Sequence, residues 1–244
     1  MQKVICLFFT VFVCKCALNA QTIEPSKGVD KNTLQTEIES IYSIEKEDEN
    51  KIKSWSQPSL LFRYGFLKNV ELQFNFPIKQ EKYFKKNELV YSSNTFDDLQ
   101  LGISINLWKQ KKLLPETALM YRSLIHYKSD FKLLHAGQVI SLNLSNRLNP
   151  KLVLTNNIGY ASEKENSYST FFVSNLSHST SEKLSLFIEY SCYNTPQQNK
   201  FQNALIGFGY AFTNNISFEG AVSKGLNYNQ YYTGGRLTFV FNNL

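Results

Sequence analysis

The sequence is poor in residues that could cross-link it. It has 4 cysteines in 244 residues, and three of them, Cys6, Cys14 and Cys16, fall within the first twenty positions. Only Cys192 lies further along the chain. If the N-terminal stretch is removed on export, no intramolecular disulfide can form. The remaining chain must therefore be stabilised by its fold alone.

Long apolar runs are also missing. A transmembrane helix needs about 18 or more consecutive apolar residues, and no part of the chain provides them. The most apolar stretch runs from Val4 to Val13 and is too short to span a bilayer as a helix. The sequence therefore excludes α-helical membrane spans.

The residue clusters that support catalysis or metal binding are absent as well. The 3 histidines are His126, His135 and His178, and none lies among cysteines or carboxylates with metal-ligand spacing. No glycine-rich phosphate loop precedes a helix. "HSTS" at 178 to 181 places His beside Ser, but turn chemistry explains these residues best. We expect no enzymatic activity, no metal and no cofactor.

Charge is modest and dispersed. The formal net charge is +6, and Lys and Arg are spread over turns and loops rather than gathered in one patch. A nucleic-acid partner is therefore not expected.

The first twenty residues have the layout of a secretory signal peptide. Basic Lys3 precedes the apolar run, and small residues end at Ala20, after which cleavage is expected. Lipoprotein processing at Cys14 or Cys16 is the weaker interpretation, because neither has the preceding small residues. Residues 21–31 show no periodicity and are expected to form a flexible periplasmic lead-in.

From Asn32 to the end, the chain alternates between apolar and polar residues in segments of about ten, as strands do when their faces meet different surroundings. In "KLSLFIEY", for example, Leu184, Leu186 and Ile188 share one parity. We predict twelve strands, near 33–44, 54–64, 70–79, 97–108, 115–126, 135–146, 152–161, 168–177, 184–193, 202–212, 216–223 and 231–241.

The predicted connections alternate in length along the chain. Segments such as "GFLKN", "RLNPK" and "TNN" are short, whereas "EKEDENK" and the stretch around "QEKYFKKNELVYSSN" are longer and polar. All the short connections then fall at one end of the sheet. Outer-membrane barrels show this asymmetry, with tight periplasmic turns and longer external loops. The sequence thus predicts an all-β fold, an antiparallel up-and-down transmembrane β-barrel of residues 32–244 with both termini in the periplasm.

The two faces of the predicted strands differ sharply. In the six clearest strands one parity carries no charge, as lipid requires because a charge near the bilayer centre costs about 2 to 4 kcal/mol. A soluble core would exclude charge equally, so periodicity alone leaves a soluble β protein open. The opposite parity would face a lumen, with these candidate residues: Arg63, Glu71, Asp98, Glu116, Arg122, Glu189, Glu219 and Arg236.

Aromatic residues favour the membrane interpretation. Trp108, Tyr210 and Phe241 are among those placed beside short turns or the C-terminus, whereas Trp55 and Tyr232 are among those placed toward the longer loops. Two such girdles are typical of the two lipid–water boundaries of a barrel.

Several stretches resemble a known family. They are "LLFRYGFLKNVELQF", "SEKLSLFIEY", "TNNISFEGAVSKGLN" and "YYTGGRLTFVF", together with "NTLQTE". They are similar to the outer-membrane transporter family described as meta-pathway phenol-degradation proteins. The positions that fit the family's pattern are Tyr64, Gly65, Gly225, Leu226, Asn227, Tyr231, Tyr232 and Gly235. The chain departs from the usual pattern in ending "FNNL" rather than on an aromatic residue. The resemblance implies a barrel that moves small, including hydrophobic, molecules.

The expected function is passage of a small molecule across the outer membrane of a Gram-negative cell, through a lumen lined by both signs of charge. The alternative is a non-conducting structural or surface-interaction barrel, plugged by charges that pair across its interior, with its function in the external loops. The expected partners are outer-membrane lipid, an unidentified small-molecule substrate and the barrel-assembly machinery.

Overall fold

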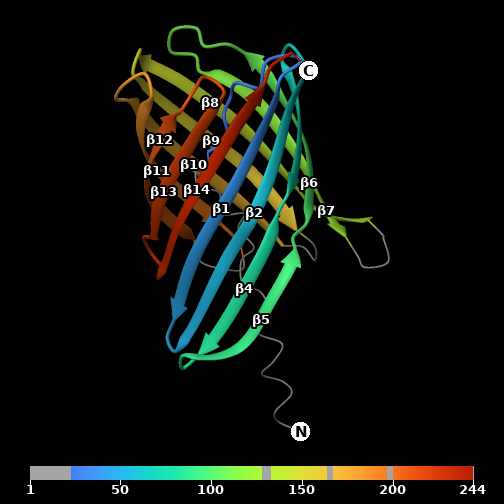
Figure 1. Cartoon of the computed structure of the whole chain (residues 1–244), viewed down its shortest axis with the longest axis vertical. Coiled ribbons are helices and arrows are strands. Elements are labelled where there is room, and N and C mark those ends of the chain that lie inside the picture. The colour runs from blue at the N-terminus through green and yellow to red at the C-terminus, as the bar shows by residue number, and fades with distance from the viewer. Residues whose placement is uncertain (1–22, 128–132, 164–166, 197–199, 244) are drawn as a thin grey trace.

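The protein is a closed antiparallel β-barrel (Figure 1). The computed structural model describes residues 23–127, 133–163, 167–196 and 200–243. Each strand pairs with its neighbours along the chain, and the sheet closes because β1 (Leu34–Glu47) pairs with both β14 (Gln230–Phe241) and β2 (Asn50–Leu67). Closure leaves the barrel itself without the exposed sheet edges that promote aggregation.

Fourteen strand segments make up the twelve barrel strands. A barrel strand, whether continuous or divided into two segments, is called a stave. β3 (Val70–Phe76) and β4 (Ile78–Lys85) both pair with β2 and form one stave interrupted at Pro77. β6 (Leu99–Trp108) pairs with β3, and β5 (Glu88–Phe96) pairs with β4. β5 and β6 are likewise two parts of one stave. Proline cannot donate to a strand ladder, which explains the break at Pro77.

The other eight staves are single strands. They are β7 (Glu116–Tyr127), β8 (Leu133–Asn149), β9 (Leu152–Glu163), β10 (Tyr168–Ser179), β11 (Leu184–Asn194), β12 (Phe201–Ala211), β13 (Ile216–Gly225) and β14. Together with β1, β2 and the two divided staves, they confirm the predicted fold and the predicted number of strands.

Two of the predicted long loops are wrong. The stretch from 80 to 96 is the hairpin β4–β5, and β1 and β2 continue through "EKEDENK" with only Asp48 and Glu49 between them. The polar side chains there hid strands whose backbones pair fully, from Glu39–Ser59 outward on β1–β2 and from Ser56–Lys79 outward on β2–β4. These strands project beyond the rest of the barrel at the end opposite the short turns (Figure 1).

The end of this projection has one free edge. β6 pairs with β7 as far as Leu99 and Ile125, whereas β5, which continues the same stave, pairs on one side alone, with β4, among the described residues. The side chains on both faces of β5 are largely exposed.

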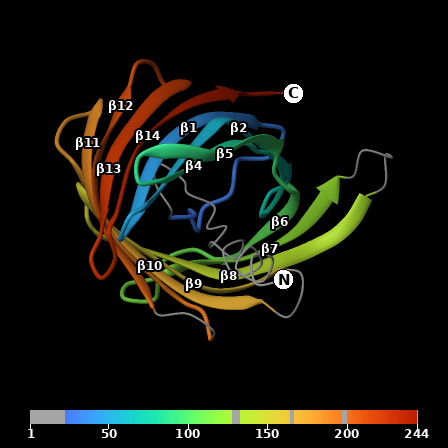
Figure 2. The same cartoon turned by 90° about the horizontal axis from the view of Figure 1, so that it is seen from below.

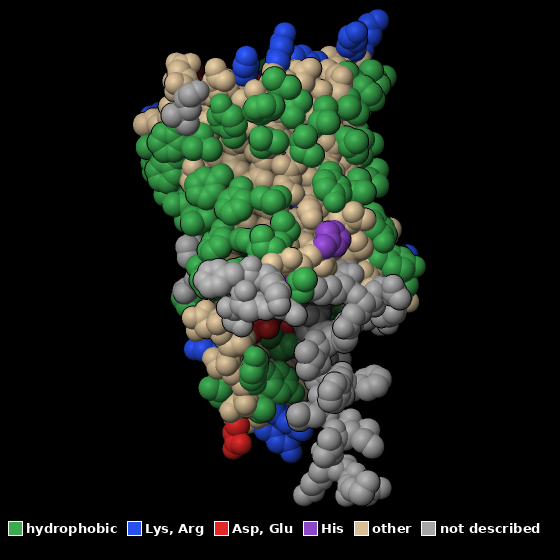
Figure 3. Space-filling view, turned by 90° about the vertical axis from the view of Figure 1, so that its right-hand side faces the viewer, with side chains coloured by type: hydrophobic (Ala, Val, Ile, Leu, Met, Phe, Trp, Pro, Cys, Tyr) green, Lys and Arg blue, Asp and Glu red, His purple; other side chains and the backbone are tan. Residues whose placement is uncertain are grey.

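The outer wall of the barrel is apolar. Side chains on the parity predicted to be apolar are exposed on this wall. Examples, with the exposed fraction of each residue, are Leu72 (41%), Leu101 (46%), Ile188 (55%), Ile206 (60%) and Val222 (53%). Figure 3 shows hydrophobic side chains covering the wall, with charged groups toward its two ends. So wide an exposed apolar surface is unfavourable in water and fits the hydrocarbon of a bilayer. The soluble alternative is therefore not supported.

The interior is mostly polar. Most of the buried side chains are polar or charged, among them Arg63, Glu71, Asn143, Asn157 and Glu189. This inverts the usual arrangement of a soluble protein and matches a barrel with a lumen. One part of the wall, formed by β1 and β11–β14, is apolar instead, with a buried cluster of Ile41, Phe187, Leu205, Ala221 and Tyr232. Tyr232 therefore lies inside the barrel and not in the outer girdle where its neighbour Tyr231 is exposed.

No helix in the described ranges is long and apolar enough to cross a membrane.

Candidate functional site: the barrel interior

Residues 23–31 lie inside the barrel. Figure 2, which looks along the barrel from below, shows this dark blue segment within the ring of strands. Ile23 and Ser26 are buried. The sequence predicts a periplasmic lead-in for residues 21–31, and the structure places residues 23–31 in the interior instead. Sequence reasoning missed this because the segment has no regular structure and is held by side chains from distant strands.

Polar side chains from β9 and β7 hold the start of the segment. The amide of Asn157 contacts both backbone groups of Glu24: the Glu24 N–H donates to Oδ1 at 2.6 Å, and Nδ2 donates to the Glu24 carbonyl at 2.9 Å. Arg122 Nη2 lies 2.8 Å from Glu24 Oε1, an ion pair whose angle falls outside hydrogen-bond geometry. Asn106 donates to the Ser26 carbonyl at 2.9 Å. Asn106, Arg122 and Asn157 lie on β6, β7 and β9, so side chains from three strands hold the start of the segment.

The end of the segment packs against β2 and β3. The Val29 N–H donates to Glu71 Oε2 at 2.7 Å. The Asn32 N–H donates to the Gly65 carbonyl at 2.8 Å, and the Gly65 N–H donates to the Thr33 carbonyl at 3.0 Å. A Cβ on Gly65 would lie 2.0 Å from the Asp30 carbonyl oxygen. Gly65 therefore permits the close approach of two backbones.

Gly65→Ala is expected to displace residues 29–30 and to destabilise the protein by about 1 to 3 kcal/mol, the usual range for overpacking. The measurement is urea unfolding of the protein refolded into lipid vesicles. Gly28→Ala is the matched control, because its Cβ would meet Glu71 at an ordinary 3.5 Å. Equal effects of the two substitutions would contradict the contact.

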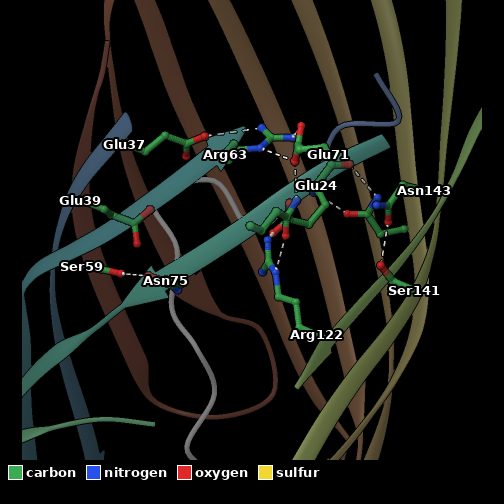
Figure 4. Close-up of polar contacts among 12 residues, drawn as sticks. Glu24, Glu37, Glu39, Ser59, Arg63, Glu71, Asn75, Arg122, Ser141 and Asn143 are labelled. Atoms are coloured by element: carbon green, nitrogen blue, oxygen red, sulfur yellow. Dashed lines mark hydrogen bonds and ion pairs between the residues drawn. The ribbon is translucent and has the colours of Figure 1, made fainter. Parts of the chain in front are cut away.

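Arg63 and Glu71 form the central ion pair of the interior. Arg63 Nε and Nη2 donate to the two oxygens of Glu71 at 2.8 Å and 3.1 Å, a two-pronged geometry that fixes both side chains. Glu71 also accepts from Gln73 at 2.6 Å, and Arg63 Nη1 lies 3.5 Å from Glu37. Gln73 in turn accepts from Arg122 Nε at 2.7 Å. Figure 4 shows Glu37, Arg63, Glu71, Glu24 and Arg122 gathered in one region of the interior.

A second cationic centre lies beside the first. Arg236 on β14 contacts three carboxylates: Glu37 at 3.2 Å, Glu39 at 3.2 Å and Glu219 at 3.7 Å. Glu37 thus lies between Arg63 and Arg236 and links the two centres. Together they form a charged network across β13, β14, β1, β2 and β3.

Five of the predicted lumen residues lie together, and the other three lie apart from them. Arg63, Glu71, Arg122, Glu219 and Arg236 belong to the central network. Glu116 accepts from Asn106 at 3.2 Å nearby. Glu189 is buried on the other side and accepts from Asn175 at 3.1 Å. Asp98 lies toward the projecting end, where its Oδ1 is 2.7 Å from His126 Nδ1.

The sequence prediction did not include five further residues that belong to the network or hold the segment. They are Glu24, Glu37, Glu39, Gln73 and Asn157. Glu37 and Glu39 alternate with Ile38 in the predicted first strand, so strict parity would have found them. Asn157 also has the inward parity of its predicted strand, 152–161, whereas Glu24 had no such signal, since its role depends on the path of an irregular segment.

A small cavity remains at the centre of the network. Its volume is about 20 Å³, and its lining includes Glu24, Glu37, Arg63, Arg122 and Arg236. A cavity of that volume holds a water molecule or two. Among the described residues no group of three or more His, Cys, Asp or Glu is arranged to hold a metal ion.

These features define a class: a closed twelve-stranded outer-membrane β-barrel with an occupied, charged lumen. The particular family follows from the sequence. Residues 22–242 match the family described as "Putative MetA-pathway of phenol degradation", and the chain belongs to it. A search among curated proteins finds no match.

Solved structures share the fold. An outer membrane channel from Pseudomonas putida F1 aligns with a TM-score of 0.65 at 10% identity, covering 90% of this chain and 100% of that one. The KdgM porin in complex with disordered oligogalacturonate aligns at 0.55 and 8% identity, covering 84% and 99%. The translocator domain of the autotransporter NalP from Neisseria meningitidis aligns at 0.54 and 11%, covering 86% and 88%. At these identities the likeness establishes the fold.

Proposed function

We propose that the protein is an outer-membrane channel that passes a small molecule, with residues 23–31 as its constriction. The observation that carries this proposal is the arrangement of the lumen: a polar interior inside an apolar wall, occupied by a segment held through side chains. A segment held by ion pairs and amide contacts can be displaced without unfolding the barrel, because no strand depends on it for pairing.

Two parts of the interior differ, which bears on the substrate. Arg63, Arg122 and Arg236 with their carboxylate partners form a charged part, and the cluster around Phe187 and Tyr232 forms an apolar part that shares β1, β13 and β14 with it. Such a lumen suits small molecules that have both an apolar and a polar part. The family membership and the channel and porin among the similar structures support passage rather than catalysis.

A non-conducting barrel is the second candidate, and the same segment favours it. Glu24, Val29 and Ser26 contact several strands at once, and the cavity of about 20 Å³ beside Glu24 is small. In that case the projecting strands at the other end would carry the function, as an interaction surface.

Liposome swelling and planar-bilayer recording separate the two candidates. The purified protein, exported and cleaved near Ala20, is expected to give small conductance steps and to admit small aromatic acids faster than sugars of similar size. Liposomes that admit no solute, together with a silent bilayer, would favour the non-conducting barrel.

A further inference from the structure

Five lysines lie on the outward face of neighbouring strands, toward the end of the barrel opposite the short turns. Residues paired across strands project to the same face. The row of paired residues through Ile44 on β1 includes Tyr231 on β14 and Lys224 on β13 to one side, and Lys53 on β2 and Lys82 on β4 to the other. Ile44 follows Ile38 on the outward parity. The next row outward contains Lys46 and Lys51. We call this set, Lys46, Lys51, Lys53, Lys82 and Lys224, the outer lysine cluster.

Two pairs in the cluster place like charges directly opposite each other. Lys46 faces Lys51 across β1 and β2, and Lys53 faces Lys82 across β2 and β4. Like charges at directly opposed positions destabilise a sheet. Two such pairs on adjoining strands need an anionic partner to offset their repulsion.

The protein does not supply that partner from its described residues. None of the five lysines is in an ion pair with a described acidic side chain, whereas Lys79, on the opposite face of β4, lies 2.6 Å from Glu81. Glu45, Glu81 and Glu88 all lie on that opposite face by register. The lysines and acids of the projecting strands are thus segregated to different faces.

Aromatic side chains place the cluster at a lipid boundary. Trp55 packs edge-on against Tyr42 at 5.9 Å and donates to Ser40, and Tyr231 is exposed one row further out. Such rings gather where lipid meets water. Lys53 Nζ lies 4.8 Å from the centre of Phe84, and Lys224 Nζ lies 5.6 Å from that of Tyr231. These rings hold the ammonium groups against the wall, at the level where lipid headgroups begin.

We propose that the outer lysine cluster binds the phosphate groups of lipid A, the phosphorylated glycolipid of the outer leaflet. The C-terminus, the start of β1 and the short turns lie at the other end of the barrel (Figure 1), which is the periplasmic side of an outer-membrane barrel, so the cluster faces the outer leaflet. A lysine near a membrane surface contributes about 1 kcal/mol of attraction to anionic lipid. Two phosphates on one lipid can contact both opposed lysine pairs at once.

The test compares Lys53→Gln/Lys82→Gln with the control Lys79→Gln/Lys85→Gln, which removes the same charge from the opposite face of β4. Both are made with Trp108→Phe, so that Trp55 is the sole tryptophan of a chain that has 2. Trp55 fluorescence and the thermal midpoint are followed in zwitterionic detergent as lipid A is added. The starting protein and the control are expected to respond with saturation, and the Lys53/Lys82 variant to need several-fold more lipid A.

Without lipid A the Lys53/Lys82 variant is expected to be at least as stable as the starting protein, because the substitution removes a repulsion. This result distinguishes a binding cluster from one that stabilises the sheet. Equal responses of the two double variants to lipid A would overturn the proposal. So would a response to inorganic phosphate, or to phosphatidylcholine, as strong as that to lipid A.

Discussion

Deleting residues 23–30 is expected to raise the single-channel conductance several-fold, because the segment lies in the lumen beside its charged centre. A barrel of twelve strands is intermediate between those filled by side chains and those that hold an open channel, so the segment decides which behaviour prevails. The deletion leaves Gln21 and Thr22 after the expected cleavage site and removes no strand residue. Planar-bilayer recording of the purified variant measures the effect.

A point substitution tests the mechanism of closure. Glu24→Gln removes the ion pair with Arg122 and is expected to increase brief openings. Lys27→Gln is the control within the same segment, since Lys27 is 69% exposed and contacts only nearby Asp30 among the described residues. If deletion of the segment leaves conductance unchanged, residues 23–31 do not form the constriction.

Glu71→Gln is expected to destabilise the barrel by about 3 to 5 kcal/mol, the range found when one member of a buried ion pair is removed. Glu71 is fully buried, and the substitution leaves Arg63 with Glu37 alone, at 3.5 Å. It also weakens the acceptor for Val29. Urea unfolding in lipid vesicles gives the free energy.

Glu49→Gln is the matched control for Glu71→Gln. Its ion pair with Lys86 is exposed, with 61% and 69% of the two side-chain surfaces accessible, so water and salt screen it and removal should cost less than about 1 kcal/mol. If the two substitutions had equal effects, the interior network would contribute no more than a surface pair.

The alternation of side chains predicted the strands, because lipid outside and water inside impose opposite demands on successive residues, and the connection lengths and aromatic girdles favoured a membrane barrel. Glu71 and Leu72 are adjacent, yet one is fully buried and the other 41% exposed. The hairpin β4–β5 escaped prediction for the same reason, since its residues leave the hydrocarbon and lose the apolar parity that marks a strand.

The candidate site was predictable only where it lies on strands. Strand parity was the ground for naming Arg63, Glu71, Arg122, Glu219 and Arg236 as lumen candidates. Their pairing was not predictable, because it depends on barrel closure, which brings Arg236 on the last strand beside Glu37 on the first. The occupation of the lumen by residues 23–31 depends on long-range amide contacts that leave no local pattern.

The unpaired edge of β5 fixes how deeply the barrel can sit in its bilayer. Backbone N–H and C=O groups that meet hydrocarbon without a partner are penalised by several kcal/mol each. Among the described residues, β5 has no strand partner on the side away from β4, beyond the last contact of β6 with β7 at Leu99 and Ile125. The acyl chains must therefore stop near that level on this side. The projecting strands thus set the insertion depth of the barrel, because they must stay outside the hydrocarbon core of the membrane.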